Sequence, residues 1–467
     1  MSNRPIHLAL ALVGLAGLWA CWCDTAMIWD GAYQFCCSLS AGEPFAYLSR
    51  FHSWILWKPL LWLSQWTDKT QLLGFVYGLP FCMAPFVGVT LSWWIVRRHA
   101  PHLIIWVLFG SAITLLPGQI FMINDSVFQM HLFWPVFLAA FVPLTNCQGL
   151  AMALLGVFQL SHPVGIVLCG TVAVAAFVIG SFGPPEQRAA RLGWGFYHYL
   201  LAWGGIAKLL LWPDPYAARE ATTGALLNTL TGVVGFPILG MILAWIAAWT
   251  LLRHAGKEGK FVLGVAGRRT LILLAIIGAL WTVWAAVPAF WQAALNYRRW
   301  VAPFSLPFLA AALFEIWRGR SILQSELAFR SRVSVSLAAI FFIVLGTQSF
   351  VWARLYHRLA AEVRAWPTTW MPESQLAWTK GTALDHWGLF SQVIAVQGRE
   401  PRVLLWTEEM EAAAHADPPR VAFSPFNSIM PTTLPHDWFH WERLLAALAK
   451  EEKSTASSSP NSNVFAR

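Results

Sequence analysis

The sequence predicts an α-helical polytopic membrane protein with about eleven transmembrane helices and a small C-terminal α/β extramembrane domain. Two observations support this prediction. Of the 467 residues, 57% are hydrophobic and only 12% are charged, whereas soluble domains carry roughly a quarter charged residues. The apolar residues also form long continuous blocks instead of periodic stripes, and a block of about 18 or more with few charges is typical of a spanning helix.

The apolar blocks that we expect to cross the bilayer recur throughout the region before residue 353. Some of them, such as 103–117 and 149–160, are short for a hydrocarbon layer of about 30 Å. The stretch 54–66 is rich in Trp and Leu but too short to cross, so we expect an interfacial or re-entrant helix there. The predicted spans are 6–23, 70–96, 103–117, 127–144, 149–160, 164–182, 193–212, 222–252, 270–291, 301–317 and 333–352.

The distribution of charge predicts a cytoplasmic N-terminus, because short cytoplasmic loops carry an excess of Lys and Arg. In this orientation the strong basic clusters all fall inside: Arg4, Arg97, Arg98, Arg188, Arg191, Arg253, Lys257, Lys260, Arg268, Arg269, Arg318, Arg320, Arg330 and Arg332. The outer loops hold fewer basic residues and these acids: Asp24, Asp30, Glu43, Asp68, Asp125, Asp214 and Glu220. An odd number of crossings then places the C-terminal domain on the extracytoplasmic face. The low share of Lys relative to Arg and the lack of a retention signal favour a bacterial inner (plasma) membrane.

Changes in composition along the chain predict three parts. Residues 1–352 form the transmembrane module, with a large first external loop at 24–69. Residues 353–450 mix charges with short apolar runs, of which Val403–Trp406 has the pattern of a strand, and we expect a small extramembrane domain there. Residues 451–467 are rich in Ser and Asn and are predicted to be disordered.

The composition argues against two kinds of site. The formal charge of +9 comes from short basic clusters between apolar blocks, with no basic stripe among exposed aromatics, so we expect no nucleic-acid partner. Four cysteines gather around the end of the first span, Cys21, Cys23, Cys36 and Cys37, without paired C-x-x-C spacing, so a zinc site is not expected. One disulfide could form between these clusters if the loop faces an oxidising compartment.

The first candidate site lies in the loop after the first span, where Asp30 follows Ile28 and Trp29. A carboxylate among aromatic rings is partly desolvated, which raises its proton affinity and suits a general base. If the stretch is helical, Tyr33 and Gln34 lie on the same face as Asp30. The alternative is an interfacial Asp that caps a short helix.

The second candidate site precedes the predicted span at 127–144. Asp125 lies in a run of residue types that favour a helix N-cap, which is one explanation for its presence. Gln129 and His131 follow within two turns, inside what should be apolar helix, and Asp125 and Gln129 share a face because they are four residues apart. A second acid at the outer surface could bind a divalent cation or position a hydroxyl. His131 by itself is more often a buried histidine with a satisfied partner than a ligand.

The third candidate site is the basic pair Arg298 and Arg299, which breaks the charge rule on the side where Arg should be scarce. Arginine forms planar, bidentate bonds with phosphate, so the pair predicts a site for a lipid phosphate or pyrophosphate. Lys58 in the first loop could add to the same positive area. The alternative is that both arginines extend towards lipid headgroups.

Together these features resemble the GT-C superfamily of membrane glycosyltransferases. The resemblance rests on an acid soon after the first span, a re-entrant segment, a second acid in the next external loop, and the entry Tyr297–Phe304 into a late helix. It covers most of the chain as architecture, through short motifs. One departure is that many members carry a paired acid in the first loop, whereas Asp30 is followed by Gly31.

The resemblance implies a GT-C fold and a lipid-linked sugar donor, a polyprenyl-phosphate sugar. Asp30 would then be the base that activates an acceptor hydroxyl, with Asp125 assisting, and the two would bind Mg²⁺ or Mn²⁺ if a metal is used. Arg298 and Arg299 would hold the donor phosphate. This chemistry is coherent, because phosphate is already a competent leaving group and the reaction needs a base and cations.

Two other functions fit the sequence. A transporter or flippase for a lipid-linked or small substrate would need polar groups near the bilayer midplane. The candidates for these are His131, Gln159, His198, Lys208 and Asn228. A non-catalytic membrane assembly protein would instead bind a partner through its C-terminal region, and nothing in the sequence identifies that partner.

Overall fold

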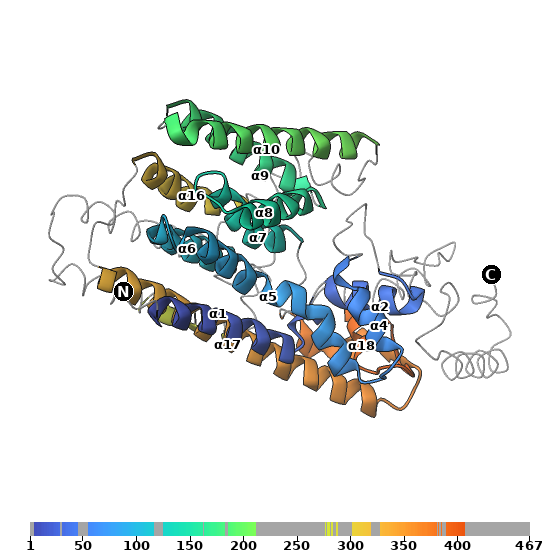
Figure 1. The fold of residues 1–467 in the computed structure, drawn as a ribbon. Coiled ribbons are helices and arrows are strands. Elements are labelled where there is room, and N and C mark those ends of the chain that lie inside the picture. Colours follow the sequence, from blue (N-terminus) through green and yellow to red (C-terminus); the bar gives the residue numbers. More distant parts are fainter. Residues whose placement is uncertain are drawn as a thin grey trace. The chain divides into compact units, whose positions relative to one another are not determined.

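The computed structural model describes residues 4–28, 30–44, 55–115, 125–161, 163–182, 185–211, isolated positions between 276 and 287, 301–318, 327–380, 382, 384 and 389–406. This part of the chain is mostly helical, and its sheet consists of two short strands (Figure 1). The chain divides into two compact units. The first comprises 1–20, 48–52 and 81–349, and the second comprises 21–47, 53–80 and 350–467.

The helices form where the sequence predicts apolar spans. Within the described ranges, four of them are long and apolar enough to cross a membrane: Arg4–Trp22, Thr70–Val96, Val164–Phe182 and Val333–Ala365. At about 1.5 Å per residue, even the shortest of these reaches about 28 Å, close to the thickness of the hydrocarbon layer. Shorter apolar helices occupy the predicted spans that begin at 103, 127, 149 and 301. The predicted span at 222–252 and most of the one at 270–291 lie outside the described residues.

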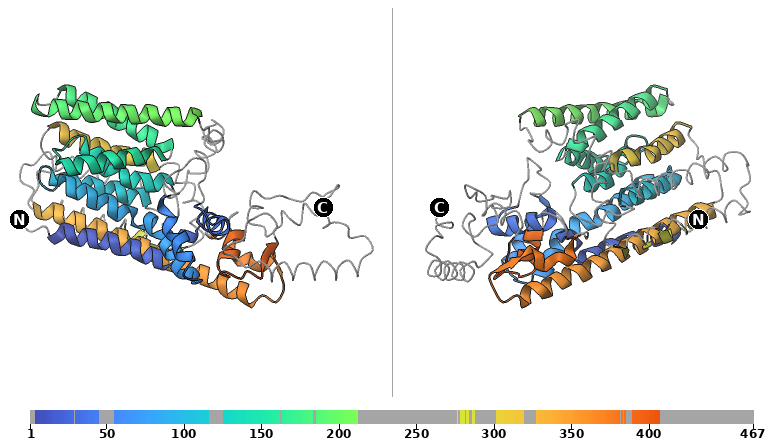
Figure 2. Two further views of the ribbon diagram at one scale, coloured as in Figure 1. Left: turned by 45° about the vertical axis from the view of Figure 1, so that its right-hand side comes forward. Right: turned by 180° about the vertical axis from the view of Figure 1, so that it is seen from behind.

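The first unit is a bundle of apolar helices. Its members are α1 (Arg4–Trp22, up to residue 20), α5 (Thr70–Val96, from residue 81), α6 (Ile104–Leu115), α7 (Asp125–Ala139), α8 (Asn146–Phe158), α9 (Pro163–Phe182), α10 (Pro185–Leu211), α16 (Val301–Arg318) and α17 (Leu327–Ala365, up to residue 349). α9 and α10 are joined by a short link and pack along each other in both views of Figure 2. α16 packs on α6, and α7 contacts α6, α8 and α9.

The outward faces of this bundle carry large apolar side chains. On α9 they include Val167, Val174 and Phe182, and on α10 they include Leu210, all with more than three-fifths of the side chain exposed. Contiguous apolar surface of this kind is rare on soluble monomers. It fits a surrounding of lipid chains and supports insertion of these helices in a membrane.

Small residues allow the helices of the first unit to approach closely. Pro135 lies inside α7 and has no amide hydrogen, so the carbonyl of His131, one turn earlier, loses its helical partner. That carbonyl oxygen lies directly against Gly88 of α5, where an added Cβ atom would overlap it. Close backbone approach at glycine is a common way of packing helices in membranes.

The second unit is mixed in structure. It contains the short helices α2 (Asp30–Ala41), α4 (Lys58–Ser64) and α18 (Leu389–Ala395), the start of α5 and the end of α17. α4 lies inside the predicted re-entrant stretch 54–66, so a short helix there is confirmed. β1 (Trp370–Pro372) and β2 (Leu404–Trp406) pair in parallel, with Trp370 opposite Leu404. β2 confirms the strand predicted at Val403–Trp406.

Candidate functional site around Asp24

The two acids predicted from the sequence each begin a helix. Asp30 is the first residue of α2 and Asp125 is the first residue of α7. Both therefore stand at a helix N-terminus, where the helix dipole favours a negative charge. Their side chains lie outside the described part of the chain. The catalytic and metal-binding roles of Asp30 and Asp125 stay predictions.

Three other predicted site residues belong to the second unit. Tyr33 and Gln34 lie on α2, the first half-buried and the second buried, and Gln34 Oε1 has no hydrogen-bond donor among the described residues. Lys58 is the first residue of α4 and is exposed. The role of Lys58 in binding a donor phosphate stays a prediction.

The remaining predicted residues lie elsewhere. Gln129 and His131 are buried in α7 of the first unit. Neither ring nitrogen of His131 has a hydrogen-bond partner within the described part of the structure. Arg298 and Arg299 lie outside the described residues. The roles predicted for these residues stay predictions.

The structure draws attention to a different acid, Asp24, which follows the last residue of α1 by two positions. Asp24 begins the short 3-10 helix η1 (Thr25–Met27) with φ 54° and ψ 30°. Among the described residues it is the one non-glycine residue with a positive φ. Its backbone N–H donates to Cys21 O (3.1 Å) and its carbonyl accepts from Met27 N–H (2.9 Å), which closes the turn tightly. Left-handed backbone at a non-glycine residue is enriched at functional sites.

Residues far along the chain bury Asp24. The indole N–H of Trp352 on α17 donates to Asp24 O (3.0 Å), and the ring of Tyr356 stacks on Trp352 with centroids 5.5 Å apart. On α5, a Cβ atom added to Gly74 would lie 3.1 Å from Asp24 Oδ1. Asp24, Gly74, Trp352 and Tyr356 are called the Asp24 cluster below. Because Gly74 has no side chain, the carboxyl has room beside α5.

Burial changes the proton affinity of Asp24. The residue is only 9% exposed, and desolvation raises the pKa of its carboxyl from the ordinary 3.8 to about 7. No side-chain cap bond of Asp24 to η1 is formed, and among the described residues no cation opposes the shift. A carboxyl with a pKa near neutrality can both accept and release a proton at physiological pH.

Hydrogen bonds fix the turn that carries Asp24. Gln392 Nε2 on α18 donates to Met27 O (2.8 Å), and both groups are buried. The Tyr77 hydroxyl on α5 donates to Gly31 O (2.9 Å) at the start of α2. Trp57 packs on Tyr77 with ring centroids 5.2 Å apart. The segment between α1 and α2 is therefore held from α5 and from α18, which fixes the position of the turn.

A second group of buried polar side chains lies in the first unit. His131 on α7, Gln159 in the 3-10 helix η4 (Gln159–Ser161) and His198 on α10 are almost fully buried. Lys208 Nζ donates to Leu160 O (3.0 Å) near the same helices. Ionisable and amide groups inside an apolar bundle are costly, and in membrane proteins they often mark a pathway or a polar site.

The described residues form no group of three or more His, Cys, Asp or Glu side chains placed to hold a metal ion. None of the seven cysteines forms a disulfide in this structure, so the possible bond near the end of α1 is not formed. Burial and the neighbouring Cys37 raise the pKa of the Cys36 thiol well above its ordinary value, which disfavours the thiolate as a ligand.

The described part of the chain is mostly helical, with four helices long and apolar enough to cross a membrane, and it buries a carboxyl just after the first of them. Comparison with known protein families, with curated proteins and with solved structures finds no match to this chain.

Asp24 is one of the acids of the predicted outer loops, and its sequence context did not mark it as a site residue. One sequence signal distinguishes it: Asp24 is the first acid in the chain, and it follows the first apolar block directly. The residues that bury it, Trp352 and Tyr356, lie more than 320 positions away, so the desolvation could not be read from the local sequence.

Proposed function

We propose that this protein is a membrane glycosyltransferase that moves a sugar from a polyprenyl-phosphate donor to an acceptor hydroxyl, with Asp24 as the base. The observation that supports it best is the position of Asp24: a buried carboxyl with a pKa of about 7, held in a strained turn at the end of a membrane helix. The proposal includes about eleven crossings of a bacterial inner membrane, with the N-terminus cytoplasmic and the C-terminal domain outside.

In the proposed reaction the Asp24 carboxylate takes the proton from the acceptor hydroxyl. The hydroxyl oxygen forms a bond to the anomeric carbon of the donor sugar. The bond from that carbon to the phosphate oxygen breaks, and the polyprenyl phosphate leaves with the electron pair. Arg298 and Arg299 are the candidates for binding that phosphate, because guanidinium groups bind it bidentately.

Asp30 remains the base proposed from the sequence, and a pair of variants separates it from Asp24. Membrane vesicles containing Asp24→Asn or Asp30→Asn are incubated with a panel of tritium-labelled polyprenyl-phosphate hexoses and pentoses. The label transferred to endogenous acceptors is then counted. Loss of a general base costs about 10²–10⁴-fold, so we expect Asp24→Asn to lower the rate at least about 100-fold.

Glu43→Gln is the matched control, because Glu43 is an exposed acid in the same unit. This variant should transfer sugar at the unmodified rate. Full turnover by Asp24→Asn with loss of turnover in Asp30→Asn would return the role to Asp30. Transfer by neither the unmodified protein nor any variant, with every donor of the panel, would remove the enzyme proposal.

A second candidate function is transport of a lipid-linked or small substrate, and the buried polar groups His131, Gln159 and His198 favour it. Proteoliposomes that contain the protein and a fluorescent polyprenyl-phosphate sugar test it by the rate at which the label becomes accessible from outside. A transporter would keep this rate in Asp24→Asn and lose it in His131→Leu. A glycosyltransferase would lose sugar transfer in Asp24→Asn. In that case neither the unmodified protein nor His131→Leu would move the labelled lipid across the membrane.

A further inference from the structure

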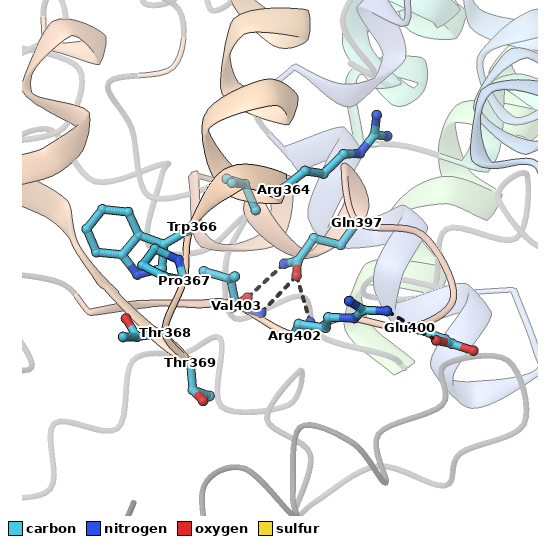
Figure 3. Close-up of a pocket in the computed structure, with 10 residues that line it drawn as sticks. Arg364, Trp366, Pro367, Thr368, Thr369, Gln397, Glu400, Arg402 and Val403 are labelled. Carbon is cyan, nitrogen blue, oxygen red and sulfur yellow. Dashed lines mark hydrogen bonds and ion pairs between the residues drawn. The ribbon is translucent and has the colours of Figure 1, made fainter.

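A pocket of about 690 Å³ lies in the second unit, apart from the Asp24 cluster (Figure 3). One wall is the end of α17 and the segment that leads to β1. The other wall is the loop between α18 and β2. A volume of this size holds a small ligand of a few rings. The pocket is lined by Val363, Arg364, Trp366, Pro367, Thr368, Thr369, Gln397, Glu400, Arg402 and Val403.

Gln397 gives the loop wall its shape. Its side-chain oxygen accepts from the backbone N–H of Arg402 (2.7 Å) and of Val403 (2.8 Å), and its amide donates to Val403 O (2.7 Å) and Val393 O (2.8 Å), as the dashed lines in Figure 3 show in part. These four bonds use the full capacity of the amide. Gln397 therefore shapes the pocket wall and has no bonding capacity left for a ligand. Beside it, Gly398 turns the chain with φ 79°.

Two charged side chains, those of Arg402 and Glu400, lie beside Gln397 in the lining of the pocket. Arg402 and Glu400 form a loose ion pair at 4.0 Å, with side chains 70% and 42% exposed. An ion pair this open contributes little to stability. It offers a planar set of N–H donors beside a carboxylate acceptor, both within reach of a ligand. The guanidinium of Arg364 is already directed to Val396 O (2.9 Å).

The opposite wall adds hydroxyl groups and an aromatic ring. Thr368 and Thr369 line this wall, and the Thr368 hydroxyl donates to Trp370 O (3.1 Å), which leaves its oxygen able to accept. The indole N–H of Trp366 donates to the same carbonyl oxygen (2.9 Å), so the orientation of the ring is fixed. An oriented aromatic ring provides a flat apolar surface at low entropic cost.

We propose that this pocket binds a neutral saccharide. A sugar ring presents many hydroxyls that both donate and accept, together with an apolar C–H face. Adjacent donor and acceptor groups, as in Arg402 and Glu400, match vicinal hydroxyls, and the paired Glu400 carboxylate offsets the charge of Arg402 that would attract an anion. Trp366 supplies a surface for the apolar face. The inference goes beyond glycosyl transfer, because it concerns binding alone.

The test is saturation-transfer-difference NMR on the full chain in lipid nanodiscs that were prepared without glycosidic detergents, whose sugar headgroups would occupy the pocket. The probes are maltose, cellobiose and lactose as neutral saccharides, and glucuronate and inorganic phosphate as anions. We expect at least one neutral disaccharide to bind. Arg402→Ala and Glu400→Gln should each weaken its binding at least about tenfold, the effect of losing one or two hydrogen bonds.

Arg354→Ala is the control, since Arg354 is an exposed arginine on α17 that does not line the pocket. It should bind the disaccharide as the unmodified protein does. Each variant is also compared with the unmodified protein in thermal unfolding. If Arg402→Ala unfolds early, the charge-keeping variant Arg402→Lys replaces it, and a weakening of several-fold is then expected from the loss of the planar donor set.

The experiment is repeated in Asp24→Asn, so that binding is measured in a protein that cannot transfer sugar. Binding that survives in Asp24→Asn supports the saccharide site whether or not the glycosyltransferase proposal holds. Binding of glucuronate or phosphate in place of the neutral sugars would overturn the inference. Equal binding by all variants, or no binding of any probe, would overturn it as well.

Discussion

The indole N–H of Trp352 donates a hydrogen bond to the backbone carbonyl of Asp24 at 3.0 Å, across 328 positions of the sequence. Both groups are buried. The bond links α17 to the turn after α1 at Asp24, the residue that carries the buried carboxyl. It leaves the carboxyl oxygens outside the bond, so that Trp352 fixes the backbone of Asp24 without neutralising its acid.

Replacing Trp352 with Phe tests the contribution of this hydrogen bond to stability. The variant Trp352→Phe keeps an aromatic ring next to Tyr356 but removes the only N–H that the indole carries, which leaves the Asp24 carbonyl without this donor. We expect the free energy of unfolding to fall by about 0.5–1.5 kcal/mol, the contribution of one hydrogen bond, because the Asp24 carbonyl still accepts from Met27 N–H. Denaturant unfolding in detergent measures it. Trp22→Phe, at a position that is 62% exposed, should change the stability by less than about 0.5 kcal/mol.

The pH dependence of stability follows from the pKa of Asp24, which folding raises from 3.8 to about 7. Between these values the folded state binds more protons than the unfolded state, so the free energy of unfolding decreases as pH rises from about 4 to about 7. Asp24→Asn removes this dependence. We expect the variant to be similar in stability near pH 4 and more stable than the unmodified protein by a few kcal/mol near pH 8. Equal slopes for both proteins over this range would contradict the burial of an uncompensated carboxyl.

The same pKa predicts a rate profile for the proposed enzyme. A base must be deprotonated to act, so the rate of sugar transfer should rise about tenfold per pH unit below pH 7 and level off above it. Initial rates in vesicles between pH 5 and pH 8.5 measure this profile. A midpoint near pH 4 would instead assign the rate to a solvent-exposed carboxylate.

Gly74→Ala tests the space that the Asp24 carboxyl occupies. The added Cβ atom would lie 3.1 Å from Asp24 Oδ1 and 2.9 Å from the terminal methyl carbon of Met27. We expect a loss of about 1–3 kcal/mol in stability from overpacking, and a shift in the midpoint of the rate profile because the carboxyl must move. Gly170→Ala is the matched control, since a Cβ atom there meets nothing within 4 Å. It should be neutral or slightly stabilising.

Gly88→Ala tests the packing of the first unit. A Cβ atom at Gly88 would overlap the carbonyl oxygen of His131, which Pro135 has left without a helical donor. Backbone cannot yield as a flexible side chain does, so we expect a loss of at least about 3 kcal/mol or a failure to fold. Gly149→Ala, where nothing lies within 4 Å of the added atom, serves as the control. Unfolding temperatures of the two variants in detergent provide the comparison.

Much of the helical framework was predictable from the sequence. The apolar blocks at 6–23, 70–96 and 164–182 became α1, α5 and α9 within three residues at each end. Hydrophobicity and length act locally, and each block carries enough apolar surface to form a helix in lipid by itself. The short helix α4 and the strand β2 were predictable for the same reason, from local runs of apolar residues.

The candidate site was less predictable. Asp24 and Asp30 both follow the first apolar block, and residue type and spacing favoured Asp30 because aromatic neighbours surround it in sequence. Trp352 and Tyr356 on α17 bury Asp24. Gly74 on α5, which has no side chain, leaves room for its carboxyl. No local pattern contains these three residues.

The sequence by itself determined that the described part of this chain forms apolar helices suited to a membrane, and where several of them begin and end, because the transfer of apolar segments from water to lipid depends on composition and length. The tertiary structure decided which acid is desolvated, and which loop residues face a pocket. The reason is that a pKa and a cavity depend on neighbours brought together by packing, and packing joins residues that the chain separates by hundreds of positions.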